Sequence, residues 1–151
     1  MTTAVELPVE ERILQLLQHL GIEKAHFAAR ELGDWQGLAK AYPETIASLT
    51  LVCPRPVEPS VLRPLASRLL VITGDRDRPA QMVQRAAASV SDVTVKTLSG
   101  YANDRYADVA ADRADEVNTA IVDFLMGMEQ GQMARAIALA EGEGEVAGIS
   151  Y

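Results

Sequence analysis

Residues with reactive or strongly polar side chains gather in three predicted turns of this 151-residue chain. Glu31 lies between an apolar run and a helix start, Asp77 follows a second apolar run, and a third turn contains Tyr101, Arg105 and Tyr106. A carboxylate such as Glu31 can act as a nucleophile that forms a covalent ester, whereas Asp77 could satisfy the N–H groups at the start of the next helix. The third turn could bind a small ligand.

The remaining residue types point away from metal, cofactor and disulfide chemistry. The two histidines, His19 and His26, lie in different predicted elements and do not have metal-ligand spacing. Cys53 is the single cysteine, so it has no disulfide partner in the chain, and we interpret it as a small buried apolar residue. The glycines near the C-terminus alternate with glutamates and lack the lysine of a phosphate-binding loop. We therefore expect neither a metal nor a cofactor.

Strands and helices alternate along the chain and would hold these turns in place. Apolar runs of strand length predict strands, and apolar residues recurring at helical spacing, as at Ile13, Leu16, Leu17 and Leu20, predict helices. The expected strands cover residues 25–29, 46–52, 68–73 and 93–98; the expected helices cover residues 7–20, 33–41, 79–90, 109–126 and 129–141. Such alternation predicts an α/β fold of three layers, with a mostly parallel sheet of about four strands between helices.

Five local patterns occur in the order found in the C-terminal half of the α/β-hydrolase fold. Three concern supporting elements: Leu-x-x-Leu-Gly-Ile-Glu-Lys-Ala-His ending at His26, Tyr-Pro-Glu at 42–44 before the strand at 46–52, and a closing helix at 116–125. Two more, Leu-Val-Ile-Thr-Gly-Asp-Arg-Asp ending at Asp77 and Leu-Ser-Gly-Tyr-Ala-Asn ending at Asn103, resemble the loops that carry the acid and the histidine of the catalytic triad. The resemblance covers residues 7–127 and implies a truncated α/β-hydrolase-like fold without a lid.

The resemblance also implies a degenerate catalytic triad. Ala-Arg-Glu-Leu-Gly at residues 29–33 takes the place of the Gly-x-Ser-x-Gly nucleophile elbow, which puts Glu31 at the serine position. Asn103 falls at the histidine position, and only Asp77 has the family's residue type. Loss of the nucleophile or the base lowers kcat by about a million-fold in such a site. Ordinary serine-hydrolase activity is therefore not expected from this chain alone.

Three functions remain open at this point. The strand at Ala25–Ala29 is central in the α/β-hydrolase fold but would be an edge here, because the resemblance finds no earlier strands. An open apolar edge is a liability that proteins usually cover, so we expect a second copy, another domain or residues 146–151 to cover it. The chain is then a non-catalytic domain that acts by association, an ester or thioester hydrolase completed by a second chain or domain, or a small-molecule-binding module.

Composition and charge narrow the expected partners and location. The net charge of −7 and the isoelectric point of about 4.8 disfavour nucleic acid and anionic membranes as partners. No stretch approaches the ~20 apolar residues of a membrane span, and residues 1–6 lack a secretion signal, so we expect a cytoplasmic protein. We predict one domain over residues 1–127, followed at 128–151 by a helix and a Gly/Glu-rich tail that could lead to a further domain.

Overall fold

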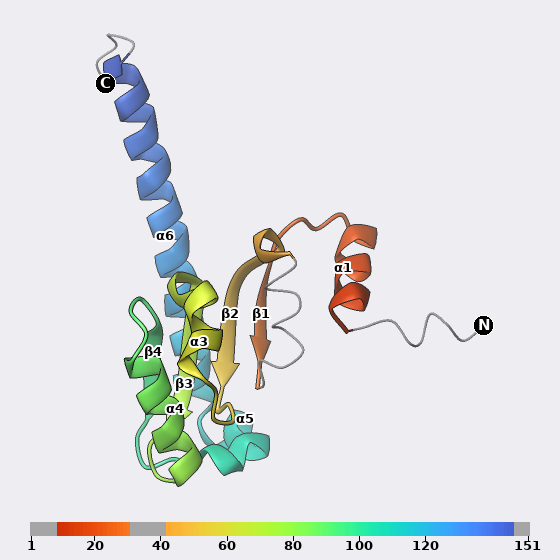
Figure 1. Cartoon of the computed structure of the whole chain (residues 1–151), viewed down its shortest axis with the longest axis vertical. Coiled ribbons are helices and arrows are strands. Elements are labelled where there is room, and N and C mark those ends of the chain that lie inside the picture. The colour runs from red at the N-terminus through yellow and green to blue at the C-terminus, as the bar shows by residue number, and fades with distance from the viewer. Residues whose placement is uncertain (1–8, 31–41, 147–151) are drawn as a thin grey trace, which may run out of the picture.

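The computed structural model describes residues 9–30 and 42–146. Four strands form one parallel sheet in the order β1-β2-β3-β4: β1 (Ala25–Ala29), β2 (Ile46–Val52), β3 (Leu69–Gly74) and β4 (Thr94–Leu98). The helices are α1 (Val9–His19), α3 (Pro59–Leu62), α4 (Arg78–Ala88), α5 (Val109–Asp112) and α6 (Ala114–Val146). Figure 1 shows the sheet with α1 at one side and α6 rising far beyond it.

The central strands follow directly from their apolar sequences. Every residue of β3 is buried, and β2 is buried along most of its length. A parallel sheet is covered on both faces, so its inner strands are near-continuous apolar runs. The predicted strands at 25–29 and 46–52 are confirmed, and the other two begin one residue later than predicted. The predicted helix at 33–41 lies outside the described residues.

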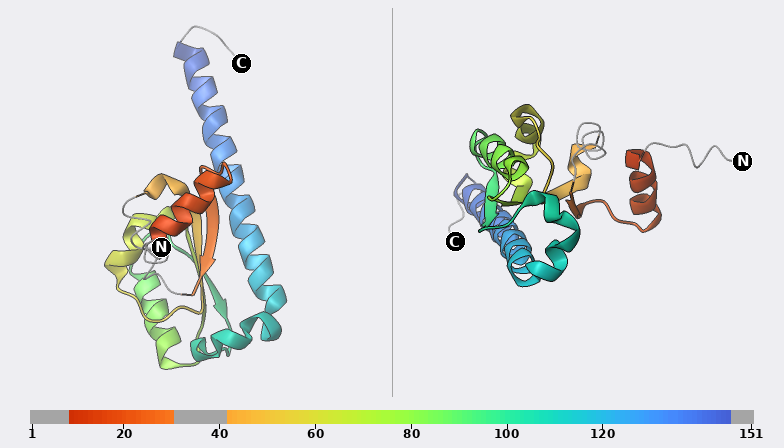
Figure 2. Two further views of the ribbon diagram at one scale, coloured as in Figure 1. Left: turned by 90° about the vertical axis from the view of Figure 1, so that its right-hand side faces the viewer. Right: turned by 90° about the horizontal axis from the view of Figure 1, so that it is seen from below.

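Helices cover the two faces of the sheet in separate layers (Figure 2). One core cluster joins β2 and β3 to α3, α4 and the 3-10 turn Arg63–Arg68, and its largest fully buried members include Ile46, Leu49, Leu62 and Leu69. A second cluster, built on Leu70, Ile72 and Leu98, packs against α5 and α6 on the opposite face. The three-layer α/β architecture is therefore confirmed. The proline-rich connection from β2 to β3 contains α3.

The C-terminal helices differ from the prediction in where they break. We expected helices at 109–126 and 129–141, but the break lies at Arg113, and α6 then runs without interruption past residue 128. Arg113 leaves the helical conformation (φ −139°, ψ 33°), and its guanidinium donates to the Ser99 carbonyl oxygen at 2.9 Å. Gly127 does not end the helix because one glycine costs only about 1 kcal/mol relative to alanine. The division at 127/128 remains a prediction.

Candidate active-site positions at the carboxyl ends of the strands

The candidate residues that the structure describes lie beyond the carboxyl ends of the strands. Asp77 follows β3, and Asn103 lies in the loop after β4. The structure brings these two residues together, because the Asn103 backbone N–H donates to Asp77 Oδ1 at 3.0 Å. Glu31, the third candidate, lies outside the described residues. Its neighbour Arg30 directly follows β1.

Asp77 fixes the loop after β4 to the start of α4. Its Oδ1 atom accepts hydrogen bonds from the backbone N–H groups of Ala80 and Asn103, each at 3.0 Å, and its Oδ2 atom accepts from Asp104 at 3.0 Å. Asp77 is the N-cap of α4, where an aspartate satisfies an N–H group that has no partner within the helix. Pro79 suits the first turn, because a proline there removes no helical hydrogen bond. The carboxylate therefore has a structural role.

The pKa of the Asp77 carboxyl lies below its ordinary value. Partial burial raises this pKa, but the N–H donors of Asn103, Asp104 and Ala80 together lower it by more. These hydrogen bonds favour the charged form. Since the pKa is lower in the folded than in the unfolded protein, the ionised carboxylate stabilises the fold above the unfolded-state pKa. That stabilisation disappears as the pH falls through the folded-state pKa.

We predict that Asp77→Asn weakens the dependence of stability on acid. In the wild-type protein, the free energy of unfolding should fall as the pH drops below about 4, where aspartate carboxylates become protonated. The variant should lose part of this fall, and it should be less stable than the wild type at pH 7. Urea unfolding between acidic and neutral pH measures both effects. Asp108→Asn, at an exposed carboxylate that pairs with Arg105 at 3.5 Å, is the matched control and should keep the wild-type profile. Equal profiles for wild type and Asp77→Asn would contradict the prediction.

Asn103 is buried, and both the oxygen and the nitrogen of its side-chain amide make hydrogen bonds. Its side-chain oxygen accepts from the Gly74 backbone N–H at 2.7 Å and from the Thr73 hydroxyl at 3.2 Å. Its amide nitrogen donates to the Pro54 carbonyl oxygen at 3.1 Å, and the residue is 2% exposed. An amide has no basic nitrogen, so Asn103 cannot accept a proton as a histidine would. Asn103 instead connects the end of β3 to the residues that follow β2.

Arg30 and Cys53 lie near the same loops and were not predicted as part of the site. The Arg30 guanidinium stacks on the Tyr106 ring at 4.7 Å, and its Nε atom is buried with no hydrogen-bond partner among the described residues. Cys53 is fully buried; burial raises the pKa of its thiol to about 11, an effect that the nearby Arg30 charge partly offsets. The thiol is therefore protonated near neutral pH, in agreement with its interpretation as a buried apolar residue. The only sequence feature that could have indicated a place for Arg30 in the site was its position directly after β1.

The residues suggested for ligand binding make contacts with one another and with Asp112 of α5. The Tyr101 hydroxyl lies 3.2 Å from the Arg105 carbonyl oxygen and 3.0 Å from Asp112 Oδ2, and its side chain is buried. The Arg105 guanidinium pairs with Asp112 at 3.1 Å. Two surface pockets among the described residues, of about 800 and 320 Å³, are lined by other residues. A ligand-binding role for Tyr101, Arg105 and Tyr106 stays a prediction.

The described residues contain neither a metal-binding cluster nor a membrane-spanning helix. In the described segments, no three histidine, cysteine, aspartate or glutamate side chains are grouped so that they could hold a metal ion. No described helix combines the length and the apolar character needed to cross a membrane.

Comparison by sequence finds no relatives, whereas comparison by structure finds several. No protein-family model matches the chain, and no curated protein does. Solved structures similar to the chain include a predicted hydrolase from Thermoplasma acidophilum (14% identity, TM-score 0.58, covering 80% of this chain and 58% of the hydrolase). A carboxylesterase structure from Nitrososphaera gargenis is also similar (10% identity, TM-score 0.64, covering 82% of this chain and 72% of the carboxylesterase). So is a meta-cleavage product hydrolase from Pseudomonas fluorescens (11% identity, TM-score 0.63, covering 78% of this chain and 70% of the hydrolase).

These similarities establish the fold and not the activity. The proteins found are α/β-hydrolase-fold enzymes, and their identity to this chain is too low to transfer a substrate. The chain spans 58% of the Thermoplasma hydrolase and about two thirds of several of the others. Four parallel strands with helices on both faces agree with this comparison. The chain therefore has a truncated α/β-hydrolase-like fold.

Proposed function

We propose that this chain is a non-catalytic α/β-hydrolase-like domain that acts by association, and that the association occurs along β1. The position of β1 supports this most directly. It pairs with β2 on one side, and among the described strands none pairs with its other side. Its sequence, Ala-His-Phe-Ala-Ala, contains no proline, lysine or acidic residue of the kind that protects an exposed strand edge.

The burial of β1 alternates along the strand, so no residue of this edge strand is fully covered. Ala25, Phe27 and Ala29 are half-buried, whereas His26 and Ala28 are exposed. Strands inside a parallel sheet are normally buried on both faces, as β3 is here. β4, the other edge strand, has one buried residue, Leu98, whereas β1 has none.

The contacts of Asp77 and Asn103 support the non-catalytic part of the proposal. The Asp77 carboxylate accepts hydrogen bonds from three backbone N–H groups. The oxygen and the nitrogen of the Asn103 side-chain amide both make hydrogen bonds to backbone groups. The hydrogen bonds that it accepts make the Asp77 carboxylate a weaker base, and the Asn103 amide has no basic nitrogen.

A hydrolase completed by a partner is the second candidate, and the hydrolase-like fold favours it. Such an enzyme should hydrolyse ester or thioester substrates only when its partner is present. Glu31→Gln and Asp77→Asn should each abolish that activity, and full activity in both variants would remove these residues as catalysts.

The association itself can be tested by the size of the particle in native cell extracts. The wild-type chain should migrate well above its own mass of 16.3 kDa. Ala28→Lys places a charge beside the strand edge and should release the monomer, since edge lysines oppose strand pairing. Met82→Lys, at a 43% exposed residue on α4, is the control and should migrate as the wild type does. A wild-type chain of monomer size would contradict the proposal.

A further inference from the structure

We propose that the partner at β1 is a second copy of this chain. The dimer is two-fold symmetric, its two β1 strands pair antiparallel, and α1 of each copy covers β1 of the other. This inference rests on the association proposed above and adds the identity and geometry of the partner.

The position of α1 is the first observation behind this dimer. Figures 1 and 2 place α1 beyond the β1 edge, away from the middle of the sheet. Its described contacts with the rest of the chain are few: Glu11 accepts a hydrogen bond from the Tyr42 hydroxyl at 3.2 Å, and Ile13 packs at the margin of the core. Because α1 lies past the edge, it can form one wall of the space that a further strand would occupy.

The exposed apolar side chains of the molecule concentrate on this segment. Seven large apolar residues are exposed among those described, and three of them are Leu16 (57%), Leu20 (58%) and Ile22 (40%). Leu17 is the one described residue of α1 that is buried. Leu16 in α1 and Leu20 just after it are both more than half exposed, so these two leucines gain little burial from their own chain. Burying each side chain against a partner would contribute about 1.5–3 kcal/mol before the cost of association.

The sequence of β1 is complementary to itself in antiparallel pairing. A two-fold contact requires that residue i meets residue j and that j meets i, which an antiparallel pair centred on one residue satisfies. With the centre at Phe27, the two phenylalanines face each other, and His26 lies opposite Ala28 of the second copy. The bulky His26 therefore meets a small residue, and no like charges meet.

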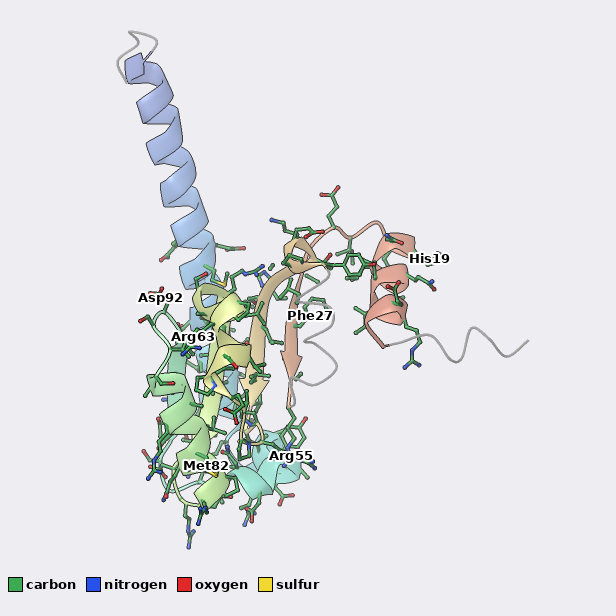
Figure 3. All side chains as sticks on the ribbon, in the orientation of Figure 1. His19, Phe27, Arg55, Arg63, Met82 and Asp92 are labelled. Atoms are coloured by element: carbon green, nitrogen blue, oxygen red, sulfur yellow. The ribbon has the colours of Figure 1, made fainter. Side chains whose placement is uncertain are left out.

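The two faces of β1 need different cover, and the dimer provides it. His26 and Ala28 are on the face where His26 bonds to Ser48 (Nδ1 to Oγ, 2.7 Å), so this face tolerates water. Phe27 is on the opposite face and packs against the apolar core (Figure 3). In the proposed dimer, α1 of the second copy lies against this apolar face. Residues 9–30 of each copy would form this interface, close to the roughly 20–30 residues per side of a standard stable interface.

Light scattering on the purified chain tests whether two copies associate. From about 1 to about 100 μM, the mass should rise to twice the chain mass of 16.3 kDa, since dimer populations depend on concentration. The double variant L16E/L20E should raise the dissociation constant at least tenfold while its circular dichroism stays that of the wild type. The control M82E/V122E changes two exposed apolar residues on α4 and α6 and should dimerise normally. A wild-type monomer at the highest concentration would overturn the dimer.

Cysteine cross-linking tests the strand register and does not depend on the α1 variant folding. In the proposed register, residue 26 of one copy lies opposite residue 28 of the other, within the 4.4–6.8 Å that joins the Cα atoms of a disulfide. A mixture of H26C and A28C should therefore form a mixed disulfide faster than either variant alone. Cys53 should not interfere, because it is fully buried. Equal rates in the mixture and in the single variants would overturn this geometry.

The outcomes separate this inference from the proposed function. The purified chain could be a monomer while cell extracts contain a larger particle that is lost in Ala28→Lys. This result would overturn the proposal of a second copy and would support association with a different chain. A monomer in both experiments would overturn both proposals. A dimer lost in L16E/L20E and cross-linked between positions 26 and 28 would support both.

Discussion

Replacing Gly74 with alanine is expected to lower the free energy of unfolding by about 4 kcal/mol. Gly74 is the last residue of β3, and a Cβ atom there would overlap the backbone carbonyl oxygen of Tyr101. That oxygen accepts hydrogen bonds from the backbone N–H groups of Asp75 at 2.9 Å and Arg76 at 3.0 Å. Backbone on both sides of the contact is held in place, so the new methyl group can be accommodated only by separating the β3 end from the loop after β4.

Thermal and urea unfolding measure this effect. A loss of about 4 kcal/mol corresponds to a fall in Tm of roughly 8–16 °C for a protein of this size. Gly127→Ala is the matched control, because a Cβ at Gly127 in α6 meets nothing within 4 Å. That control should leave stability unchanged or raise it by up to about 1 kcal/mol through helix propensity. Unfolding of Gly74→Ala at the wild-type midpoint would show that the Tyr101 loop moves without cost.

The strands of this fold could be predicted from sequence because their signals are local. The apolar runs at 46–52 and 69–74 are bounded by prolines and glycines, and they are buried on both faces as such runs should be. The weaker sequence of β1 was also assigned correctly, since it follows a helix and Gly21 at the spacing of a connected strand. The existence of these strands thus depends on residues close together in the chain.

The roles of the candidate site residues could not be predicted, because their partners are distant in sequence. Asp77 was assigned as a triad acid by resemblance or as a helix cap by position, and its bonds to Asn103 and Asp104 across the loops appear only in the structure. Asn103 was identified by resemblance as the histidine position. Its contacts with Gly74 and Pro54 have no counterpart in any sequence pattern.

The same limit explains the error at the C-terminal helices. We predicted a break between 126 and 129, where Gly127 lies, but the cost of a helical glycine is small. The actual break at Arg113 depends on long-range contacts, with the Ser99 carbonyl oxygen and with the Tyr101 ring at 5.2 Å. These contacts, like those of Asp77 and Asn103, connect the loop after β4 to other elements. That loop is therefore the region where the arrangement of the site depends most on tertiary structure.

Asn103→Ala tests how much of the fold depends on this loop, and it should lower the free energy of unfolding by about 3 kcal/mol. Alanine removes the acceptor of the buried Gly74 N–H group and the donor to the Pro54 carbonyl oxygen. Both backbone groups would remain in a site where Asn103 itself is 2% exposed, so water could not replace the lost bonds without opening the loop. The loss of stability comes from leaving buried backbone groups without hydrogen-bond partners. This penalty is larger than the net stabilisation that the hydrogen bonds themselves provide.

The matched control for Asn103→Ala is Asn118→Ala, at the second asparagine of the chain, which is exposed on α6. Asn118→Ala should be neutral or slightly stabilising, because alanine favours helix. Asn103→Ala should lower Tm by roughly 6–12 °C in the same assay. Hydrogen exchange adds a local readout: the Gly74 amide should lose protection in Asn103→Ala and keep it in Asn118→Ala. Wild-type stability and wild-type protection of Gly74 in Asn103→Ala would mean that the amide is dispensable for the fold, and Asn103 would then be free for another role at this edge of the sheet.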